Sequence, residues 1–281
     1  MTLELDPDLA RRIRLVVCDI DGTLVRDDKS LSEETVASVR RAGAAGIAVT
    51  VISARPPSGL GEIVAALGIR GAVGAFNGGT LFHAGGEVVE AHRLEPADAR
   101  ETVRRLDEAG VPVWLFADGL WIARDETSPH APLERRAAAQ APTIAADFKP
   151  WMDRVDKVVG VTDDHARLAR LEREIGQALA PRANVVRSQP YFLDVTVARA
   201  NKGDGLEALA EAAGVPLAET AAIGDMANDI PMLRRAALGV AMGQAPSEVR
   251  DAARFVTSSN EKNGVAVFLD RLLVGRRRGT L

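Results

Sequence analysis

Apolar and polar positions alternate in a regular rhythm along the first third of the chain. Short apolar runs typical of buried strands are separated by stretches typical of helices, in the order strand 14–20, helix 32–45, strand 47–52, helix 58–67 and strand 72–76. Gly46 and Gly68 end the two helices. Strands that alternate with helices in this way predict a parallel sheet with right-handed crossovers.

The same rhythm returns in the last third of the chain. The expected elements are helix 203–213, strand 220–224, helix 229–236, strand 238–242, helix 246–253, strand 254–257 and helix 264–274. These strands would extend the sheet that the first third begins. The fold class predicted for both ends together is therefore α/β, with a parallel sheet at its centre.

The middle of the chain has a different pattern. The expected strands and helices here are strand 87–93, helix 98–109, a strand pair within 111–123, strand 155–161, helix 165–179 and strand 185–186. Asp118-Gly119 splits the pair and is a strong hairpin signal. We predict a core made of residues 1–83 and 190–281, with an inserted α+β domain at 84–189. Trp114 and Trp121 fall within the hairpin, where packing of the insert's own core is favoured over the lining of a pocket.

Composition limits the class of protein. The 281 residues are 47% hydrophobic, and 35 Lys and Arg against 39 Asp and Glu give a net charge of −4. A real core is expected, whereas a nucleic-acid partner is not. No apolar run approaches the roughly 18 residues of a membrane span, and residues 1–14 lack a signal-like apolar stretch. With one cysteine, Cys18 in the first strand, a cytoplasmic protein is expected.

Two carboxylates follow the first strand. Asp19 and Asp21 are two residues apart, which in extended chain places both side chains on one face. Neighbouring carboxylates repel one another unless a cation or a shared proton lies between them. Gly22 permits a tight bend directly afterwards. The sequence alone leaves two interpretations open, a pair of solvated acids before a turn and a cation site.

Other polar residues lie at corresponding places, because ligands of an open parallel sheet bind beyond the carboxyl ends of its strands. Ser53-Ala54-Arg55 follows the second strand, Gly224 to Asp229 follows strand 220–224, and Lys202 begins a helix. Carboxylates suit Mg²⁺, while a hydroxyl, a lysine and helix amides suit a phosphate. A carboxylate can also act as the nucleophile. Taken singly, Ser53, Asp225 and Asp229 also suit helix caps, and Lys202 suits a surface position.

Together these segments resemble the motifs of the haloacid dehalogenase-like phosphatases. The matching segments are Asp-x-Asp-Gly-Thr at 19–23, the hydroxyl residue Ser53, Lys202-Gly203, and Gly-Asp-x-x-Asn-Asp at 224–229. The long insertion resembles the type IIB cap of the Cof-type subfamily, and Asn77-Gly78-Gly79 before it also fits. The resemblance implies a Rossmann-like core with an inserted α+β cap domain.

The resemblance also implies a role for each matched carboxylate. Asp19 would be the nucleophile and a ligand of Mg²⁺. Asp21 would be the general acid and base, and would offer its backbone carbonyl to the metal. Asp225 would complete the metal site, and Asp229 would support these ligands without binding the metal directly. The two neighbouring carboxylates Asp19 and Asp21 are expected to differ in protonation state.

Ser53 and Lys202 would hold the phosphoryl group, and Lys202 would offset the charge of Asp19. Further positions implied at the phosphate or the substrate are Ala54, Arg55, Asn77, Gly78 and Asn228. The subfamily usually has glycine where this chain has Ala54. Because alanine is costly at positive φ, the shape of this loop and the role of Arg55 stay open.

The implied activity is a Mg²⁺-dependent phosphatase that acts on a small phosphorylated metabolite such as a sugar phosphate. A phosphomutase is the alternative enzyme. A non-catalytic module that binds phosphometabolites is the alternative of another class, although both Asp19 and Asp21 are present. A monomer or weak homodimer is expected. Arg124, Lys157, Trp121 and Tyr191 are open candidates for cap contacts with the substrate.

Overall fold

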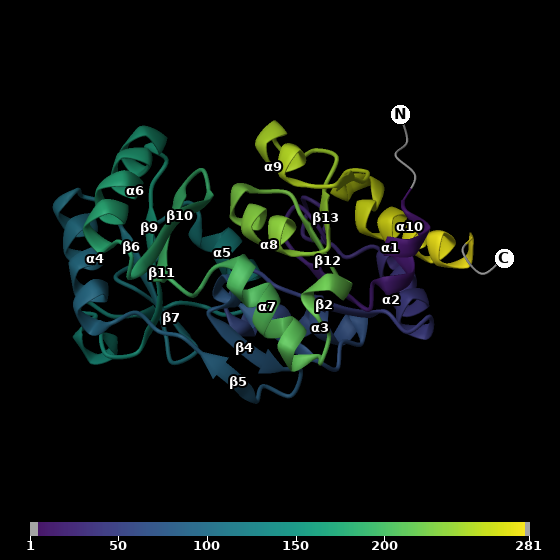
Figure 1. The fold of residues 1–281 in the computed structure, drawn as a ribbon. Helices are drawn as coiled ribbons and strands as arrows, with labels where there is room; N and C mark the ends of the chain where they lie inside the picture. The colour runs from purple at the N-terminus through teal and green to yellow at the C-terminus, as the bar shows by residue number, and fades with distance from the viewer. Residues whose placement is uncertain (1–4, 279–281) are drawn as a thin grey trace.

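The computed structural model describes residues 5–278, which form two lobes joined side by side (Figure 1). One lobe contains a five-stranded parallel sheet with the order β14-β13-β12-β1-β2. Its strands are β1 (Leu15–Cys18), β2 (Ala48–Val51), β12 (Thr220–Gly224), β13 (Leu238–Ala241) and β14 (Phe255–Val256). The parallel α/β core predicted from the two ends of the chain is confirmed.

Helices cover both faces of this sheet, because its strands are buried on both sides. Val16 and Cys18 point into one apolar cluster, and Leu15 and Val17 into another. The helices that supply the first cluster are α1 (Pro7–Arg12), α2 (Glu33–Ala44), α3 (Gly61–Leu67) and α10 (Gly264–Arg278). Those that supply the second are α7 (Lys202–Ala212), α8 (Ile230–Arg235) and α9 (Ser247–Ala252).

The predicted strand at 72–76 joins a different sheet. The strand β3 (Ala72–Ala75) meets the parallel sheet through one bridge between Ile52 and Gly74. It otherwise pairs with β4 (Thr80–His83), which in turn pairs with β5 (Val88–Ala91). The reversal after β3 rests on consecutive positive φ angles of 50°, 59° and 92° at Phe76, Asn77 and Gly78. The sequence analysis missed β4 although the turn contains Asn77-Gly78, which is itself a hairpin signal.

The second lobe contains a six-stranded sheet with the order β10-β11-β9-β6-β7-β8. Its strands are β6 (Val113–Ala117), β7 (Leu120–Ala123), β8 (Thr143–Ile144), β9 (Val155–Val161), β10 (Ala183–Gln189) and β11 (Phe192–Val197). The predicted hairpin forms, with positive φ at Asp118 and Gly119. The lobe's helices are α4 (Pro96–Glu108), α5 (Ala131–Ala137) and α6 (His165–Leu179).

The two faces of this second sheet pack against different parts of the molecule. One packs against α4 and α6, through residues such as Leu115, Leu106 and Leu168. Trp114 and Trp121 lie on the opposite face, in the apolar cluster that reaches Phe76 of the first lobe. Both tryptophans are buried, and the aromatic rings that they contact, Phe116 and Phe192, belong to the same six-stranded sheet, as expected for residues that pack within the insert. The two-residue period of a strand turns Trp114 away from its neighbour Leu115, so this packing lies on the face toward the first lobe and continues into it.

The pairing of two strands indicates where the chain passes between the core and the insert. Val88–Ala91 pairs with β4, and Phe192–Val197 pairs with β9 in the six-stranded sheet. The predicted bounds of the insert, 84–189, differ from these pairings at both ends. Strand Val88–Ala91 pairs with the core lobe, and strand Phe192–Val197 pairs with the insert. We propose that the chain crosses between the lobes after Ala91 and after Val197.

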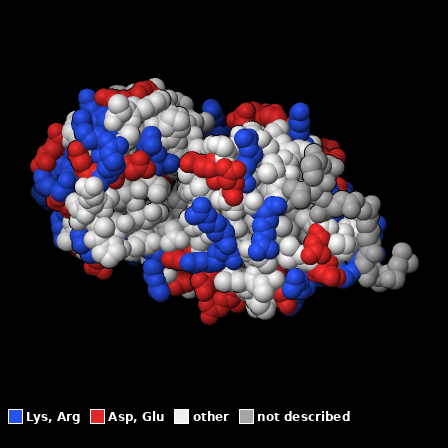
Figure 2. Space-filling model, turned by 45° about the horizontal axis from the view of Figure 1, so that its top comes forward, with Lys and Arg blue, Asp and Glu red and all other residues white. Residues whose placement is uncertain are grey.

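Within residues 5–278, six short 3₁₀ turns complete the fold at Pro57–Leu60, Phe76–Gly78, Lys149–Trp151, Leu217–Glu219, Ala227–Asp229 and Asn260–Lys262. On the face drawn in Figure 2, basic and acidic side chains are interspersed over both lobes. Over the described part of the chain, no helix combines the length and the apolar character needed to cross a membrane.

Candidate active site

The carboxyl ends of three neighbouring strands bring the predicted residues together. Cys18 of β1 is in register with Val51 of β2 and Ile223 of β12. Asp19 therefore follows β1 at the level where Ser53 and Asp225 follow the two flanking strands. The amide of Asp19 donates to the carbonyl of Ile223 at 2.9 Å, which fixes the backbone at this point.

A buried lysine joins two of the carboxylates. Lys202 is 2% exposed at the start of α7, and its Nζ contacts Oδ1 of Asp19 and, at 2.5 Å, Oδ1 of Asp229. Burial by itself lowers the pKa of Lys202, but these two carboxylates outweigh it and raise the pKa well above its usual value. The surface interpretation of Lys202 is excluded by this burial.

Asp229 is fully engaged in hydrogen bonds. Its Oδ1 accepts from Lys202, and its Oδ2 accepts from the amides of Asp225 at 2.8 Å and Met226 at 2.9 Å. A side chain at Gly224 would overlap the Asp229 carboxylate, so glycine is needed here. Asp229 thus positions the lysine and the loop that carries Asp225 at the same time.

Three carboxylates form a candidate metal centre. Oxygen atoms of Asp19, Asp225 and Asp229 all lie within 4.8 Å of one another, and all three residues are buried. Burial raises the pKa of Asp19 well above its usual value, and it raises the pKa of Asp225 to about 7. Three buried carboxylates against one lysine leave an excess of negative charge, which a hard divalent cation would neutralise. The residues present therefore fit a metal ion.

Two contacts hold Asp225 in this group. Thr23 Oγ1 donates to Asp225 Oδ1 at 3.1 Å. Gly22 has a φ of 80°, and a side chain there would overlap the Asp225 carboxylate. The bend after Asp21 therefore needs glycine for its backbone and for the close approach of Asp225.

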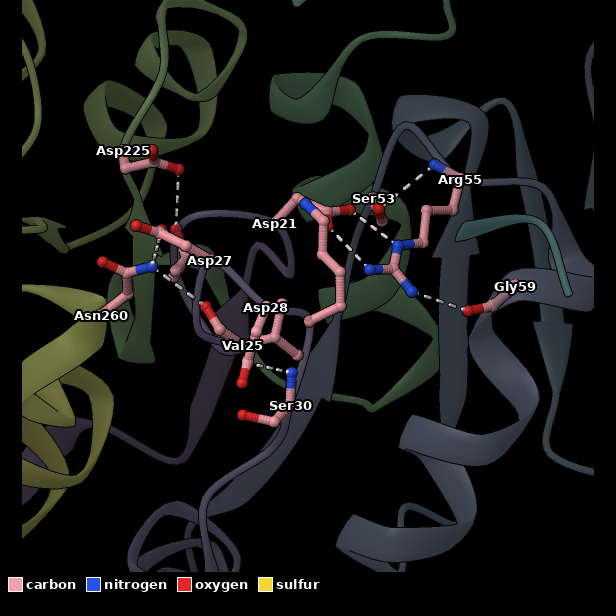
Figure 3. Close-up of polar contacts among 12 residues, drawn as sticks. Asp21, Val25, Asp27, Asp28, Ser30, Ser53, Arg55, Gly59, Asp225 and Asn260 are labelled. Atoms are coloured by element: carbon pink, nitrogen blue, oxygen red, sulfur yellow. Dashed lines mark hydrogen bonds and ion pairs between the residues drawn. The ribbon is translucent and has the colours of Figure 1, made fainter. Parts of the chain in front are cut away.

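Asp21 lies outside the carboxylate group and faces two cations (Figure 3). Arg55 donates from Nε to Oδ2 and from a terminal nitrogen to Oδ1, both at 2.7 Å, and Lys29 Nζ donates to Oδ1 at 2.8 Å. Burial raises the pKa of Asp21, but Arg55 and Lys29 outweigh it and hold the pKa at about 2. The pKa values of Asp19 and Asp21 are shifted in opposite directions, but each shift is the reverse of the one that its implied role needs, since a nucleophile is ionised and a general acid is protonated.

The remaining predicted residues lie along the loops after β2 and β3. Ser53 is 2% exposed, and its Oγ accepts from the amide of Arg55 at 3.2 Å. Asn77 Oδ1 accepts from Asn228 Nδ2 at 3.2 Å. Gly78 packs against α7, where a side chain would lie 2.6 Å from Gly205 Cα.

Ala54 does not have a positive φ, so the alanine costs nothing in backbone strain. The sequence left the shape of this loop open, and the structure shows a loop conformation that alanine adopts without strain. Its carbonyl accepts from Lys157 Nζ at 3.0 Å, which is a direct contact between the two lobes.

A family model described as haloacid dehalogenase-like hydrolase matches residues 16–269. The chain belongs to the haloacid dehalogenase-like hydrolases. It is 29% identical over 258 residues to a protein of Haemophilus influenzae that is named as a candidate phosphatase, covering 92% of this chain and 97% of the relative. The resemblance to the Cof-type subfamily is confirmed.

Solved structures agree with this assignment. A haloacid dehalogenase-like hydrolase from Bacteroides thetaiotaomicron has a TM-score of 0.83 and 28% identity, covering 92% of this chain and 99% of that one. A sugar phosphatase of haloacid dehalogenase subclass IIB has a TM-score of 0.80 and 26% identity, covering 93% and 99%. The protein is thus an enzyme of a family that hydrolyses phosphate esters.

A cavity of about 90 Å³ in this hydrolase is lined jointly by the core lobe and the cap. The core contributes Asp19, Asp21, Lys29, Ser53, Ala54, Arg55, Met226 and Asn228, and the cap Leu133, Glu134, Ala137, Lys157, Ser188, Gln189, Tyr191 and Phe192. Sequence reasoning missed Lys29 and Glu134, which lie outside the four motifs. The scarcity of lysine was the only signal for Lys29, and nothing in the pattern marked Glu134.

Proposed function

We propose that this hydrolase is a Mg²⁺-dependent phosphatase of small phosphomonoesters, such as sugar phosphates, and that it works through an aspartyl-phosphate on Asp19. The observation that carries the proposal is the buried contact of Lys202 with Asp19 and Asp229, with Asp21 held separately by Arg55 in the same cavity. The similarity to a subclass IIB sugar phosphatase supports the substrate class.

Asp19 and Asp225 would hold the metal through side-chain oxygens, and Asp21 through its backbone carbonyl. When bound, Mg²⁺ supplies positive charge that stabilises the ionised form of Asp19 and the charge on the phosphoryl oxygens. Asp229 has both oxygens engaged, so its role is to hold Lys202 and the Asp225 loop. Ser53, Asn77 and Asn228 lie where they would orient the phosphoryl group.

The covalent steps follow from the placement of the two carboxylates. A carboxylate oxygen of Asp19, oriented by Lys202, attacks phosphorus, and the bond from phosphorus to the leaving oxygen breaks. Asp21 gives its proton to the leaving oxygen. It then takes a proton from water, whose oxygen attacks the same phosphorus and releases Asp19 and inorganic phosphate.

Asp21 needs a proton before the first step, and Arg55 and Lys29 oppose this. A phosphomonoester dianion carries more charge than Asp21 and competes for the same two cations. Its arrival would weaken their hold on Asp21 and raise the pKa of that carboxyl. Substrate binding would thus prepare the acid, and the cap would keep bulk water out during the reaction.

The test is phosphate release from a panel of phosphorylated metabolites and an aryl phosphate, with and without Mg²⁺. Asp19→Asn should lower turnover by at least about 10³-fold, because it removes the nucleophile. Asp153→Asn, at a cap carboxylate with 82% of its side chain exposed, is the matched control and should match wild type. Undiminished release by Asp19→Asn would refute the mechanism. Isomerised sugar phosphate without released phosphate would indicate a mutase.

A further inference from the structure

One acidic residue of the cap faces the cavity, and no residue in the described part of the chain donates a hydrogen bond to its carboxylate. Glu134 on α5 is 9% exposed and lines the cavity that also contains Asp21 and Arg55. Among residues 5–278 its carboxylate has no hydrogen bond and no ion pair with another side chain. A buried carboxylate without donors is costly, so this position suits a ligand that brings donors with it.

The neighbouring lysine is already engaged elsewhere. Lys157 Nζ donates to Ala54 O at 3.0 Å, lies 3.4 Å from Oδ2 of Asp194, and sits 4.8 Å above the ring of Phe116. Asp194 is 1% exposed, and its Oδ1 has no partner. Lys157 and Asp194 therefore balance each other in charge, which leaves Glu134 as an additional negative charge at the cavity wall.

Contacts with the core hold α5 in place. Ser58 Oγ donates to the carbonyl of Ala138 at 2.6 Å, at the end of the helix. Gly59 approaches the carbonyl of Ala137 so closely that any side chain would overlap it. These backbone contacts fix Glu134 relative to the core loops, so its carboxylate is a built part of the cavity wall.

The rest of the cap wall suits a leaving group with hydroxyls. Ser188 and Gln189, at the end of β10, offer groups that both donate and accept hydrogen bonds. Tyr191 presents its half-buried ring, which stacks on His130 with 3.9 Å between ring centres. The core wall holds the cations Lys29 and Arg55, which suit the phosphate end of the same molecule.

We propose that Glu134 selects the leaving group by accepting hydrogen bonds from its hydroxyls. The preferred substrates are then phosphate esters of uncharged polyols or sugars, and esters whose leaving group carries a carboxylate are rejected by repulsion. This inference rests on the proposed phosphatase function and adds the chemical class of the leaving group to it. Glu134 contacts no reacting atom in this proposal, so it determines specificity and takes no part in the covalent steps.

The experiment compares glucose 6-phosphate, 6-phosphogluconate and phenyl phosphate in wild type, Glu134→Gln and Glu174→Gln. Glu174 is an exposed cap residue on α6 and serves as the matched control. Wild type should prefer the sugar phosphate to the sugar-acid phosphate in kcat/KM. Glu134→Gln should shrink that preference by about 10-fold or more, because it removes one charge without changing the volume. Phenyl phosphate, whose leaving group has no donor before cleavage, should change by less than about 3-fold.

Equal losses for glucose 6-phosphate and phenyl phosphate would show a structural role for Glu134 and overturn the proposal. An unchanged preference in Glu134→Gln would overturn it as well. Binding of the two sugar compounds to Asp19→Asn, with and without Glu134→Gln, separates this inference from the proposed function. If wild type hydrolyses nothing but Asp19→Asn binds with the expected selectivity, only the phosphatase proposal fails. If neither hydrolysis nor binding is seen, both fail.

Discussion

The two lobes treat their buried charges differently. In the core, Lys202 contacts both Asp19 and Asp229, and every oxygen of Asp229 has a donor from the protein itself. In the cap, Glu134 has no donor among the described residues, and Asp194 keeps one buried oxygen unpaired. Lys202 and Asp229 thus form a closed network in the core, whereas in the cap Glu134 retains hydrogen-bonding capacity toward the cavity that it lines.

This difference matches two tasks. A reaction that is the same for every substrate needs residues held in one geometry, and hydrogen bonds within the protein provide this. Selection of a leaving group needs polar atoms that are satisfied only when the correct molecule is present. The core residues lie on loops at strand ends, while Lys157 and Asp194 lie within the cap strands β9 and β11, on the face toward the core.

Replacing one lysine in each lobe tests this comparison most strongly. Lys202→Met leaves two buried carboxylates without their cation and should lower the free energy of unfolding by about 3–5 kcal/mol. Lys157→Met leaves one carboxylate, Asp194, without its cation at a longer contact of 3.4 Å, and the carbonyl of Ala54 without its donor, and it should cost about 1–3 kcal/mol. Urea unfolding measures both, and phenyl phosphate hydrolysis should disappear in the first variant and persist in the second.

Lys149→Met is the control for these lysine changes, since its side chain is 88% exposed. It should leave stability and turnover close to wild type. If Lys157→Met destabilises the protein more than Lys202→Met, the distinction between a closed core network and an open cap group is wrong.

The pH dependence of stability tests the Asp21 contact, which is the next largest effect. Arg55 and Lys29 hold the pKa of Asp21 at about 2, so the native state binds this proton less tightly than the unfolded state. The resulting stability is present above pH 4 and is lost as pH falls towards 2. Asp21→Asn should lower the free energy of unfolding by about 1–2 kcal/mol at pH 7, and the difference should vanish near pH 2.

Denaturant unfolding at several pH values measures this effect. Asp153→Asn, at a cap carboxylate that is 82% exposed, is a suitable control. A difference between wild type and Asp21→Asn that stays constant from pH 7 to pH 2 would show that the Asp21 contact with Arg55 contributes no pH-dependent stability.

The smallest expected effect concerns Asp156 on β9. Burial raises its pKa to about 6, and Arg93 at 3.3 Å opposes this only partly. The native state therefore binds the proton more tightly than the unfolded state, and stability falls as pH rises from 4 through 6. At pH 8, the free energy of unfolding of Asp156→Asn should be about 1 kcal/mol higher than that of wild type. Near pH 4, the two proteins should have the same free energy of unfolding. A variant less stable than wild type at pH 8 would show that the ion pair with Arg93 outweighs burial.

The sequence predicted the core well because its signals are local. Alternating apolar runs and helix-ending glycines marked nearly every core strand, and the four motifs pointed to Asp19, Ser53, Lys202 and Asp225. The roles of these residues in catalysis stay predictions. The pattern missed β4 and α5, and it did not show which face of the cap sheet the core lobe covers, because short apolar runs carry no information about a partner lobe.

By itself, then, the sequence determined the α/β class, the family and the set of carboxylates at the sheet edge. Strand ends meet at one edge in any parallel sheet, so residue order was enough to bring them together. Only the tertiary structure decided that Asp21 faces Arg55 and Lys29, and that Glu134 closes the cavity without a partner among the described residues. Those contacts join residues from separate loops and lobes, and their geometry depends on how the cap packs against the core.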